Sequence, residues 1–268
     1  MMPGEPRSSR QCRDSDPPRT SQTSALSGQT ALVTGSAARL GRATALALAA
    51  EGANVVVHYG SSAQHAEQTA EEVRRTGAKA WALQADLAKL EGTAGLFQEA
   101  CRAAGPIDIL VNNASIFDPS RLDEFTPDEL MRNVQVNAMA PLLLGRALAA
   151  QGRPGVVVNF LDSAITRYDA SHAAYHLSKR MLFSITRMMA LEFAPKVRVN
   201  AVAPGLILPP AGKDESYLHK LAAGVPLRRT GATRDVTDAV LFLVKSGFVT
   251  GQVIFVDGGH HMNGCVYG

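Results

Sequence analysis

Residues 29–41 read Gln29-Thr30-Ala31-Leu32-Val33-Thr34-Gly35-Ser36-Ala37-Ala38-Arg39-Leu40-Gly41, an apolar run that enters a glycine turn and continues as an alanine-rich segment to Ala50. A strand, a turn and a helix in this order are the context that gives a glycine-rich motif its meaning. Gly35 allows a tight backbone turn, and the N-terminus of the following helix offers unpaired N–H groups and a positive dipole end to a pyrophosphate. The stretch predicts a dinucleotide-binding turn, with an ordinary strand-to-helix turn as the alternative.

Apolar runs and amphipathic segments alternate along the rest of the chain, from Leu26 onward. The expected strands are 31–34, 54–58, 78–84, 109–111, 155–159, 198–203 and 253–256, and the expected helices are 40–50, 64–76, 92–104, 127–150, 172–193 and 235–245. This alternation predicts one α/β domain over residues 25–268, with a parallel sheet covered by helices on both faces.

Composition narrows the classes of protein that remain. The 268 residues are 46% apolar and 19% charged, with a net charge of +3 and no basic stripe. We therefore expect one large core, and neither nucleic acid nor a membrane as a partner. The three cysteines are too few and too scattered for a disulfide framework, which favours the reducing cytoplasm.

The two ends of the chain differ from its body. Residues 1–24 are rich in Arg, Ser, Pro, Thr and Gln, so we expect a disordered N-terminal extension. Near the C-terminus, His260, His261 and Cys265 lack the usual spacing of metal ligands, so we expect a surface tail and no metal site.

A tyrosine and a lysine four residues apart suggest proton-transfer chemistry. Tyr175-His176-Leu177-Ser178-Lys179 places Tyr175 and Lys179 on one helix face. The ammonium of Lys179 is expected to lower the pKa of the Tyr175 phenol and so suit it to proton transfer near neutral pH. The alternative is a surface tyrosine that happens to lie near a lysine.

Seven landmarks in a fixed order make the chain resemble the short-chain dehydrogenase/reductase family from about Ser27 to the C-terminus. They are Thr34-Gly35 with Gly41, Ala85-Asp86-Leu87, Asn112-Asn113-Ala114, Asn137, Tyr175 with Lys179, Pro204-Gly205 and Asp257-Gly258-Gly259. The resemblance implies a doubly wound Rossmann domain with strand order 3-2-1-4-5-6-7 and its site at the carboxyl edge of the sheet. It also implies that Asp86 contacts the adenine, that Asn137 supports a water relay and that Pro204-Gly205 lies beneath the nicotinamide.

Cofactor choice follows from the end of the second strand. An enzyme that prefers NAD needs an acidic residue there to bind the ribose hydroxyls, and residues 54–65 contain none, so NADP is expected. Ser61 and Ser62 can bind a 2′-phosphate, with helix capping as the alternative role. Arg39 can bring a cation to the phosphates, with a solvated surface residue as the alternative.

Asp162 departs from the family pattern, which has a Ser at this position to donate to a substrate carbonyl. An ionised carboxylate only accepts hydrogen bonds, so it suits a ring with N–H groups better than a ketone. The chain resembles the pteridine and dihydromonapterin reductases here, and also in Arg39-Leu40-Gly41, His58-Tyr59 and Asn113-Ala114-Ser115-Ile116-Phe117. In that branch the aromatic side chain, here Phe117, stacks on the pterin, an arrangement that contributes roughly 0.5–1.5 kcal/mol beyond burial. The alternatives are core packing for Phe117 and a structural hydrogen-bonding role for Asp162 in an enzyme with other substrates.

These observations predict an NADPH-dependent reductase of a dihydropterin or dihydrofolate ring, active as a homotetramer. The expected catalytic residues are Asn137, Asp162, Tyr175 and Lys179, and the expected substrate contacts are Ser115, Phe117, Asp162 and Tyr175. The expected cofactor contacts are Gly35, Arg39, Leu40, Gly41, His58, Tyr59, Ser61, Ser62, Asp86, Leu87, Asn113, Ala114, Ser115, Tyr175, Lys179, Pro204 and Gly205. The alternatives are a ketone or 3-oxoacyl-thioester reductase and a non-catalytic NADP sensor.

Overall fold

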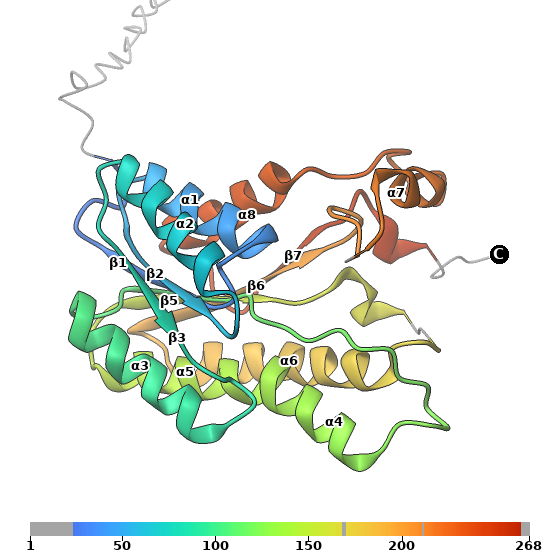
Figure 1. The fold of residues 1–268 in the computed structure, drawn as a ribbon, viewed down its shortest axis with the longest axis horizontal. Coiled ribbons are helices and arrows are strands. Elements are labelled where there is room, and N and C mark those ends of the chain that lie inside the picture. The colour runs from blue at the N-terminus through green and yellow to red at the C-terminus, as the bar shows by residue number, and fades with distance from the viewer. Residues whose placement is uncertain (1–23, 168–169, 211, 264–268) are drawn as a thin grey trace, which may run out of the picture.

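The computed structural model describes residues 24–167, 170–210 and 212–263 of the chain. The strands are β1 (Thr30–Val33), β2 (Asn54–Tyr59), β3 (Ala80–Gln84), β4 (Ile109–Asn112), β5 (Gly155–Phe160), β6 (Val197–Pro204) and β7 (Val253–Val256). The α-helices are α1 (Arg39–Ala50), α2 (Ala63–Arg75), α3 (Leu90–Ala104), α4 (Pro127–Val134), α5 (Ala140–Ala150), α6 (Ala173–Glu192), α7 (Glu215–Ala222) and α8 (Thr233–Lys245) (Figure 1).

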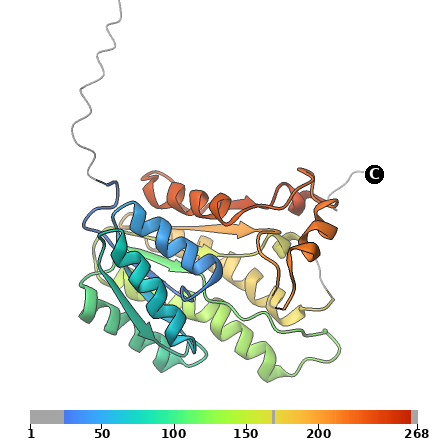
Figure 2. The same ribbon diagram turned by 45° about the horizontal axis from the view of Figure 1, so that its top comes forward.

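All seven strands are parallel and follow the order β3-β2-β1-β4-β5-β6-β7, which confirms the predicted doubly wound Rossmann topology. Helices α1, α2 and α8 cover one face of the sheet, and α3, α5 and α6 cover the other (Figure 2). The strand order reverses between β1 and β4, so the loops that leave these two strands diverge and open a crevice at the carboxyl edge.

The helix expected over residues 127–150 is interrupted. Helix α4 is followed by a π-helical turn over Gln135–Met139 before α5 begins. Pro141 has no N–H group, so it cannot donate to the main-chain carbonyl of Asn137 four residues earlier. Wide turns of this kind often occur at functional sites, and this one carries Asn137.

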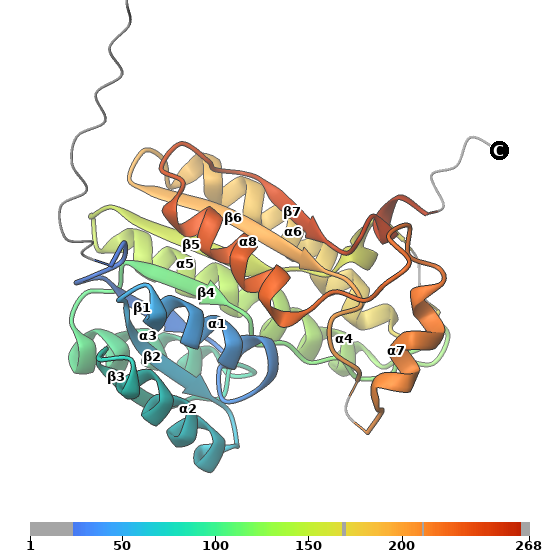
Figure 3. The ribbon, with the colours of Figure 1, turned by 90° about the horizontal axis from the view of Figure 1, so that it is seen from above.

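Helix α7 was not expected from the sequence. It is short and polar, and it begins after Asp214, whose carboxylate accepts a hydrogen bond from the N–H of Ser216 at 3.1 Å. Strands β6 and β7 point with their carboxyl ends towards the region of α7 (Figure 3). The helix therefore lies beside the edge at which a Rossmann fold binds its ligands.

The predicted N-terminal extension lies outside the described residues, apart from Ser24. Within the ranges that the structure describes, no helix is both long and apolar enough to cross a membrane.

Candidate active site

A cleft of about 710 Å³ opens at the carboxyl edge of the sheet. Every residue assigned to the cofactor from the sequence lines this cleft, and so do Phe117 and Asp162. Asn137 lies behind the wall and is fully buried. Ile207, Leu208 and Pro210 also line the cleft, from the segment that the family resemblance implies as a substrate lid. The sequence did not single out Arg132, which lines the cleft as well. The position of Arg132 one helical turn before Val136 could have identified it, since Val136 lines the same wall.

In the glycine turn, backbone segments lie so close together that two positions have no room for a side chain. Gly35 has a φ of +62°, and a Cβ there would lie 2.9 Å from the Cα of Ala114. A Cβ on Gly41 would lie 2.3 Å from the carbonyl oxygen of Gly35. Arg39 also has a left-handed φ of +54°, and its guanidinium donates to the carbonyl of Pro209 at 2.7 Å. Arg39 therefore links the turn to the segment after β6 while it lines the cleft.

His58 lines the cleft, and its side chain braces the glycine turn. Its ring is buried, with Nδ1 accepting the Gly35 N–H at 3.0 Å and Nε2 facing the carbonyl of Ala85 at 3.1 Å. Burial lowers the pKa of His58 to about 4, so the imidazole is neutral. Both ring nitrogens are used within the protein, and the side chain acts by positioning Gly35 and Ala85.

Asn113 has a similar bracing role. Its amide nitrogen donates to the carbonyls of Thr34 at 2.9 Å and Gly35 at 3.0 Å, which joins the loops after β1 and β4. The Thr34 hydroxyl in turn accepts the N–H groups of Asn113 and Ala114, each at 3.0 Å. These bonds fix the walls of the cleft where the two loops diverge.

Two serine side chains that follow β2 are accessible to a ligand. Ser61 and Ser62 are exposed, line the cleft and precede α2. The Ser62 side chain makes no capping hydrogen bond, although it stands at the N-cap position of the helix. A helix N-terminus with hydroxyls beside it suits a phosphate group.

Tyr175, Lys179 and Asp162 meet at the other end of the cleft. The Tyr175 hydroxyl donates to Oδ2 of Asp162 at 2.9 Å, while Oδ1 accepts the Ala164 N–H at 2.7 Å. The Lys179 ammonium donates to the carbonyl of Phe160 at 2.8 Å and lies 5.7 Å from the centre of the Tyr175 ring.

The pKa of Tyr175 shifts in the direction opposite to the one expected from the sequence. Burial raises the pKa of the phenol well above 10, and the charge and the hydrogen bond of Asp162 raise it further. Burial also lowers the pKa of Lys179 to about 8, against an opposing effect of Asp162. The phenol is therefore protonated at neutral pH and carries the proton that a general acid would donate.

Asn137 supports the loop that carries Ile116 and Phe117. Its amide nitrogen donates to the carbonyl of Ile116 and to the Ser178 hydroxyl, both at 3.0 Å, and its oxygen accepts the Ile116 N–H at 2.9 Å. The side chain is thus used for structure. The water relay that the family resemblance implies for Asn137 stays a prediction.

Phe117 forms an aromatic wall over Tyr175. One face of its ring stacks on His172 with centres 3.9 Å apart, and Tyr175 meets it edge-on at 4.6 Å. Ser120 fixes this arrangement because its backbone pairs with His172 and its hydroxyl accepts the Ala174 N–H at 3.1 Å. Phe117 remains 47% exposed, which leaves ring surface open to the cleft.

Comparison with known proteins agrees with this geometry. A family model described as enoyl-(acyl carrier protein) reductase matches residues 35–261. The L-xylulose reductase of Cavia porcellus is 35% identical over 245 residues, which covers 87% of this chain and 97% of that protein.

Two solved structures are also similar over most of their length. FolM alternative dihydrofolate reductase 1 from Brucella canis, complexed with NADP, has a TM-score of 0.84 and 31% identity, covering 90% of this chain and 97% of that one. The reductase LugOII, which catalyses a keto-reduction in lugdunomycin biosynthesis, has a TM-score of 0.82 and 34% identity. The match covers 89% of this chain and 100% of that one. The fold, the ordered motifs and these matches together show that the chain belongs to the short-chain dehydrogenase/reductase family of oxidoreductases.

Proposed function

We propose that this protein is an NADPH-dependent reductase of a pterin-like ring. The observation that carries the proposal is Asp162, an acceptor of hydrogen bonds that lines the cleft beside Tyr175 where the family has a donor. A pterin or folate ring presents an exocyclic amino group that such a carboxylate can bind. The similarity to the Brucella canis dihydrofolate reductase supports the same substrate class.

NADPH, when bound, supplies a hydride from C4 of the nicotinamide. The chain's residues orient and protonate the substrate. Asp162 holds the ring through its N–H groups, and the buried, protonated Tyr175 delivers a proton to the ring nitrogen. The Lys179 ammonium, fixed by the carbonyl of Phe160, stabilises negative charge that develops on the phenol oxygen.

Phe117 supplies the surface on which a flat ring can lie. His172 covers one face of Phe117, so a substrate ring can stack on the surface that faces the cleft. Such a stack would continue from His172 through Phe117 to the substrate, with the Tyr175 ring perpendicular to Phe117. A planar heterocycle uses this wall more fully than an aliphatic ketone does.

A ketone reductase of the same family is the second candidate. It is supported by relatives such as L-xylulose reductase and by LugOII. In this chain Ser163 would have to replace the missing donor. Ser163, however, is buried and is not among the described residues that line the cleft. The position of Ser163 therefore favours the pterin proposal.

The proposal is tested by NADPH consumption measured without oxygen against dihydropterins, dihydrofolate, quinonoid dihydropterins and a panel of ketones. We expect a kcat/KM for at least one dihydropterin or dihydrofolate above that for every ketone. Turnover of ketones with no activity on any reduced pterin would contradict the substrate class and leave the family assignment intact.

Phe117 offers a matched pair of variants for the same panel. Phe117→Tyr keeps the ring, whereas Phe117→Leu keeps apolar volume and removes it. Since a stacked pair contributes roughly 0.5–1.5 kcal/mol, we expect Phe117→Leu to raise the pterin KM by about 2- to 12-fold and Phe117→Tyr to change it little. An equal effect of both variants would argue against stacking.

Cofactor preference gives an independent prediction. We expect kcat/KM for NADPH to exceed that for NADH by at least about tenfold, because residues 54–65 contain no acidic side chain and Ser61 and Ser62 line the cleft there. Ser61→Asp should reduce or reverse the preference, because it sets a negative charge against the 2′-phosphate. Steady-state rates with both cofactors test this, with Ser61→Asn as the uncharged control. A parent enzyme that prefers NADH would refute the argument.

Assembly and location complete the proposal. The outer face of α6 exposes Leu177, Met181, Met188 and Leu191, a stripe spaced for helix pairing. We propose that copies of α6 pair across a two-fold axis in a cytoplasmic homotetramer. Light scattering at micromolar concentration should give about four times the chain mass of 28.4 kDa. Met188→Glu with Leu191→Glu should reduce that mass, and a monomeric parent would contradict the prediction.

A further inference from the structure

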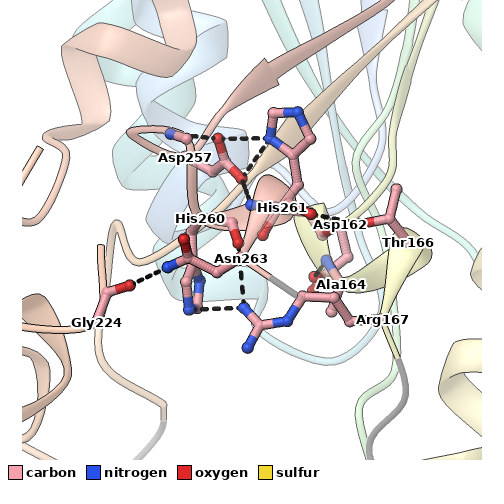
Figure 4. A network of polar contacts seen from close by, with 11 residues as sticks. Asp162, Ala164, Thr166, Arg167, Gly224, Asp257, His260, His261 and Asn263 are labelled. Atoms are coloured by element: carbon pink, nitrogen blue, oxygen red, sulfur yellow. Dashed lines mark hydrogen bonds and ion pairs between the residues drawn. The ribbon is translucent and has the colours of Figure 1, made fainter. Parts of the chain in front are cut away.

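The C-terminal segment Asp257–Asn263 lies against the turn that follows Asp162 (Figure 4). The Arg167 guanidinium reaches Nε2 of His260 at 2.7 Å and donates to the His260 carbonyl at 3.3 Å. The Thr166 hydroxyl donates to the carbonyl of His261 at 3.2 Å. The expectation of a mere surface tail is wrong for His260 and His261, since both are half-buried and joined to the active-site turn.

Asp257 makes this segment a fixed structure. Its buried carboxylate accepts the N–H groups of Gly259 at 3.0 Å and His261 at 2.6 Å, and it also contacts Nδ1 of His261 at 2.9 Å. The His261 ring stacks on Phe255 of β7 with centres 3.9 Å apart. The segment can therefore fix the position of Thr166 and Arg167, which form hydrogen bonds with it.

The turn on the other side is short and begins at Asp162. The Asp162 carbonyl accepts the Ile165 N–H at 3.2 Å, and the Arg167 N–H donates to the carbonyl of Ala164 at 2.9 Å. Arg180 of α6 donates to the carbonyls of Ile165 and Arg167. Arg167 thus ends the turn that carries Asp162, and its side chain joins that end to the C-terminal segment.

We infer that Arg167 and His260 form a positioning pair that holds Asp162 in place against Tyr175. A guanidinium can only donate hydrogen bonds, so Nε2 of His260 must be an unprotonated acceptor in this arrangement. Protonation of His260 would set two cations 2.7 Å apart and separate the pair. The inference rests on Asp162 acting in the reaction and holds for either substrate class.

Burial and the charges around His260 together set the direction in which its pKa shifts. Burial lowers the pKa of His260, and Arg167 lowers it further, while Asp257 and Asp162 oppose the shift. His261 contacts Asp257, and Arg180 contacts the carbonyl of Arg167. Because the pKa is depressed, the pair is intact above the ordinary histidine pKa of about 6.5 and is lost as pH falls through the lower folded-state value.

The test is the pH profile of kcat, measured with the best substrate of the panel, ketone or pterin. His260→Gln keeps an acceptor for Arg167 but cannot be protonated. Its kcat at pH 7.5 should therefore stay within about threefold of the parent value, and should fall less than the parent value as the pH is lowered. Arg167→Ala should lower kcat about tenfold with the KM for NADPH unchanged, since a small misplacement of a reacting group is costly. His219→Gln on α7, outside the cleft lining, is the matched control and should change neither.

A second measurement does not depend on turnover. The His260 ring should titrate by NMR with a lowered pKa in the parent and closer to about 6.5 in Arg167→Ala. An acid limb identical in the parent and His260→Gln would overturn the inference. So would an unchanged kcat in Arg167→Ala, or a His260 titration that the loss of Arg167 does not move. If the enzyme reduces ketones and not pterins, the same measurements can be made with a ketone, and they still test the Arg167–His260 pair.

Discussion

Replacing Tyr175 by Phe is expected to lower kcat at least a hundredfold while the KM for NADPH stays nearly constant. The change removes one oxygen from a buried ring, so packing against Phe117 and over Lys179 is preserved. What is lost is the proton donor, and general acid catalysis of this kind contributes about 10²–10⁴ to the rate. Steady-state rates and NADPH binding by fluorescence, measured on the same preparation, separate the two effects.

Tyr217→Phe is the matched control for this variant. Tyr217 lies on α7 and is not among the residues that line the cleft, so loss of its hydroxyl should leave kcat unchanged. Turnover of Tyr175→Phe within threefold of the parent would remove the phenol from the mechanism. The proton would then have to come from Asp162 or from solvent.

The sequence was most informative where function depends on local spacing. The turn at Gly35 needs a residue free to take a φ of +62°, and its neighbours fix the strand and helix on either side. Tyr175 and Lys179 share a helix face by their spacing alone. Strand order followed from the family resemblance and from the alternation of strands and helices. Each of these features can be recognised within a few residues of the chain.

Features that depend on distant packing were not predictable in the same way. The π-helical turn at Asn137 arises because Pro141 breaks an otherwise convincing helical pattern. The bracing role of His58 requires the loop after β3 to lie against the end of β2. The predicted direction of the Tyr175 pKa shift was wrong because burial and Asp162 both raise the pKa, and the Tyr–Lys spacing reveals neither of them.

Replacing Asp162 by Ser is expected to change the two candidate activities in opposite directions. Pterin reduction should fall at least tenfold, because the charged acceptor for the ring N–H groups is lost, and hydrogen bonds to a charged group contribute about 1.5–3 kcal/mol. Ketone reduction should be unchanged or improved, since Ser supplies a donor where the carboxylate repelled a developing alkoxide. The same variant removes two of the three causes that raise the pKa of Tyr175, which makes the phenol a stronger acid. Rates on the full substrate panel measure both directions at once.

Asp162→Asn separates charge from shape in this experiment. The amide keeps the size of the side chain, can still accept the N–H of Ala164 and removes the negative charge beside Tyr175. If charge decides selectivity, Asn should move the ratio of ketone to pterin activity in the same direction as Ser, because both variants lower the repulsion of an alkoxide. If the hydrogen-bond acceptor decides it, Asn should retain more pterin activity than Ser, because its oxygen can still accept from the ring. A parent that reduces ketones well and loses that activity in both variants would show that Asp162 itself serves the ketone reaction, and the pterin proposal would then fail on the residue that carries it.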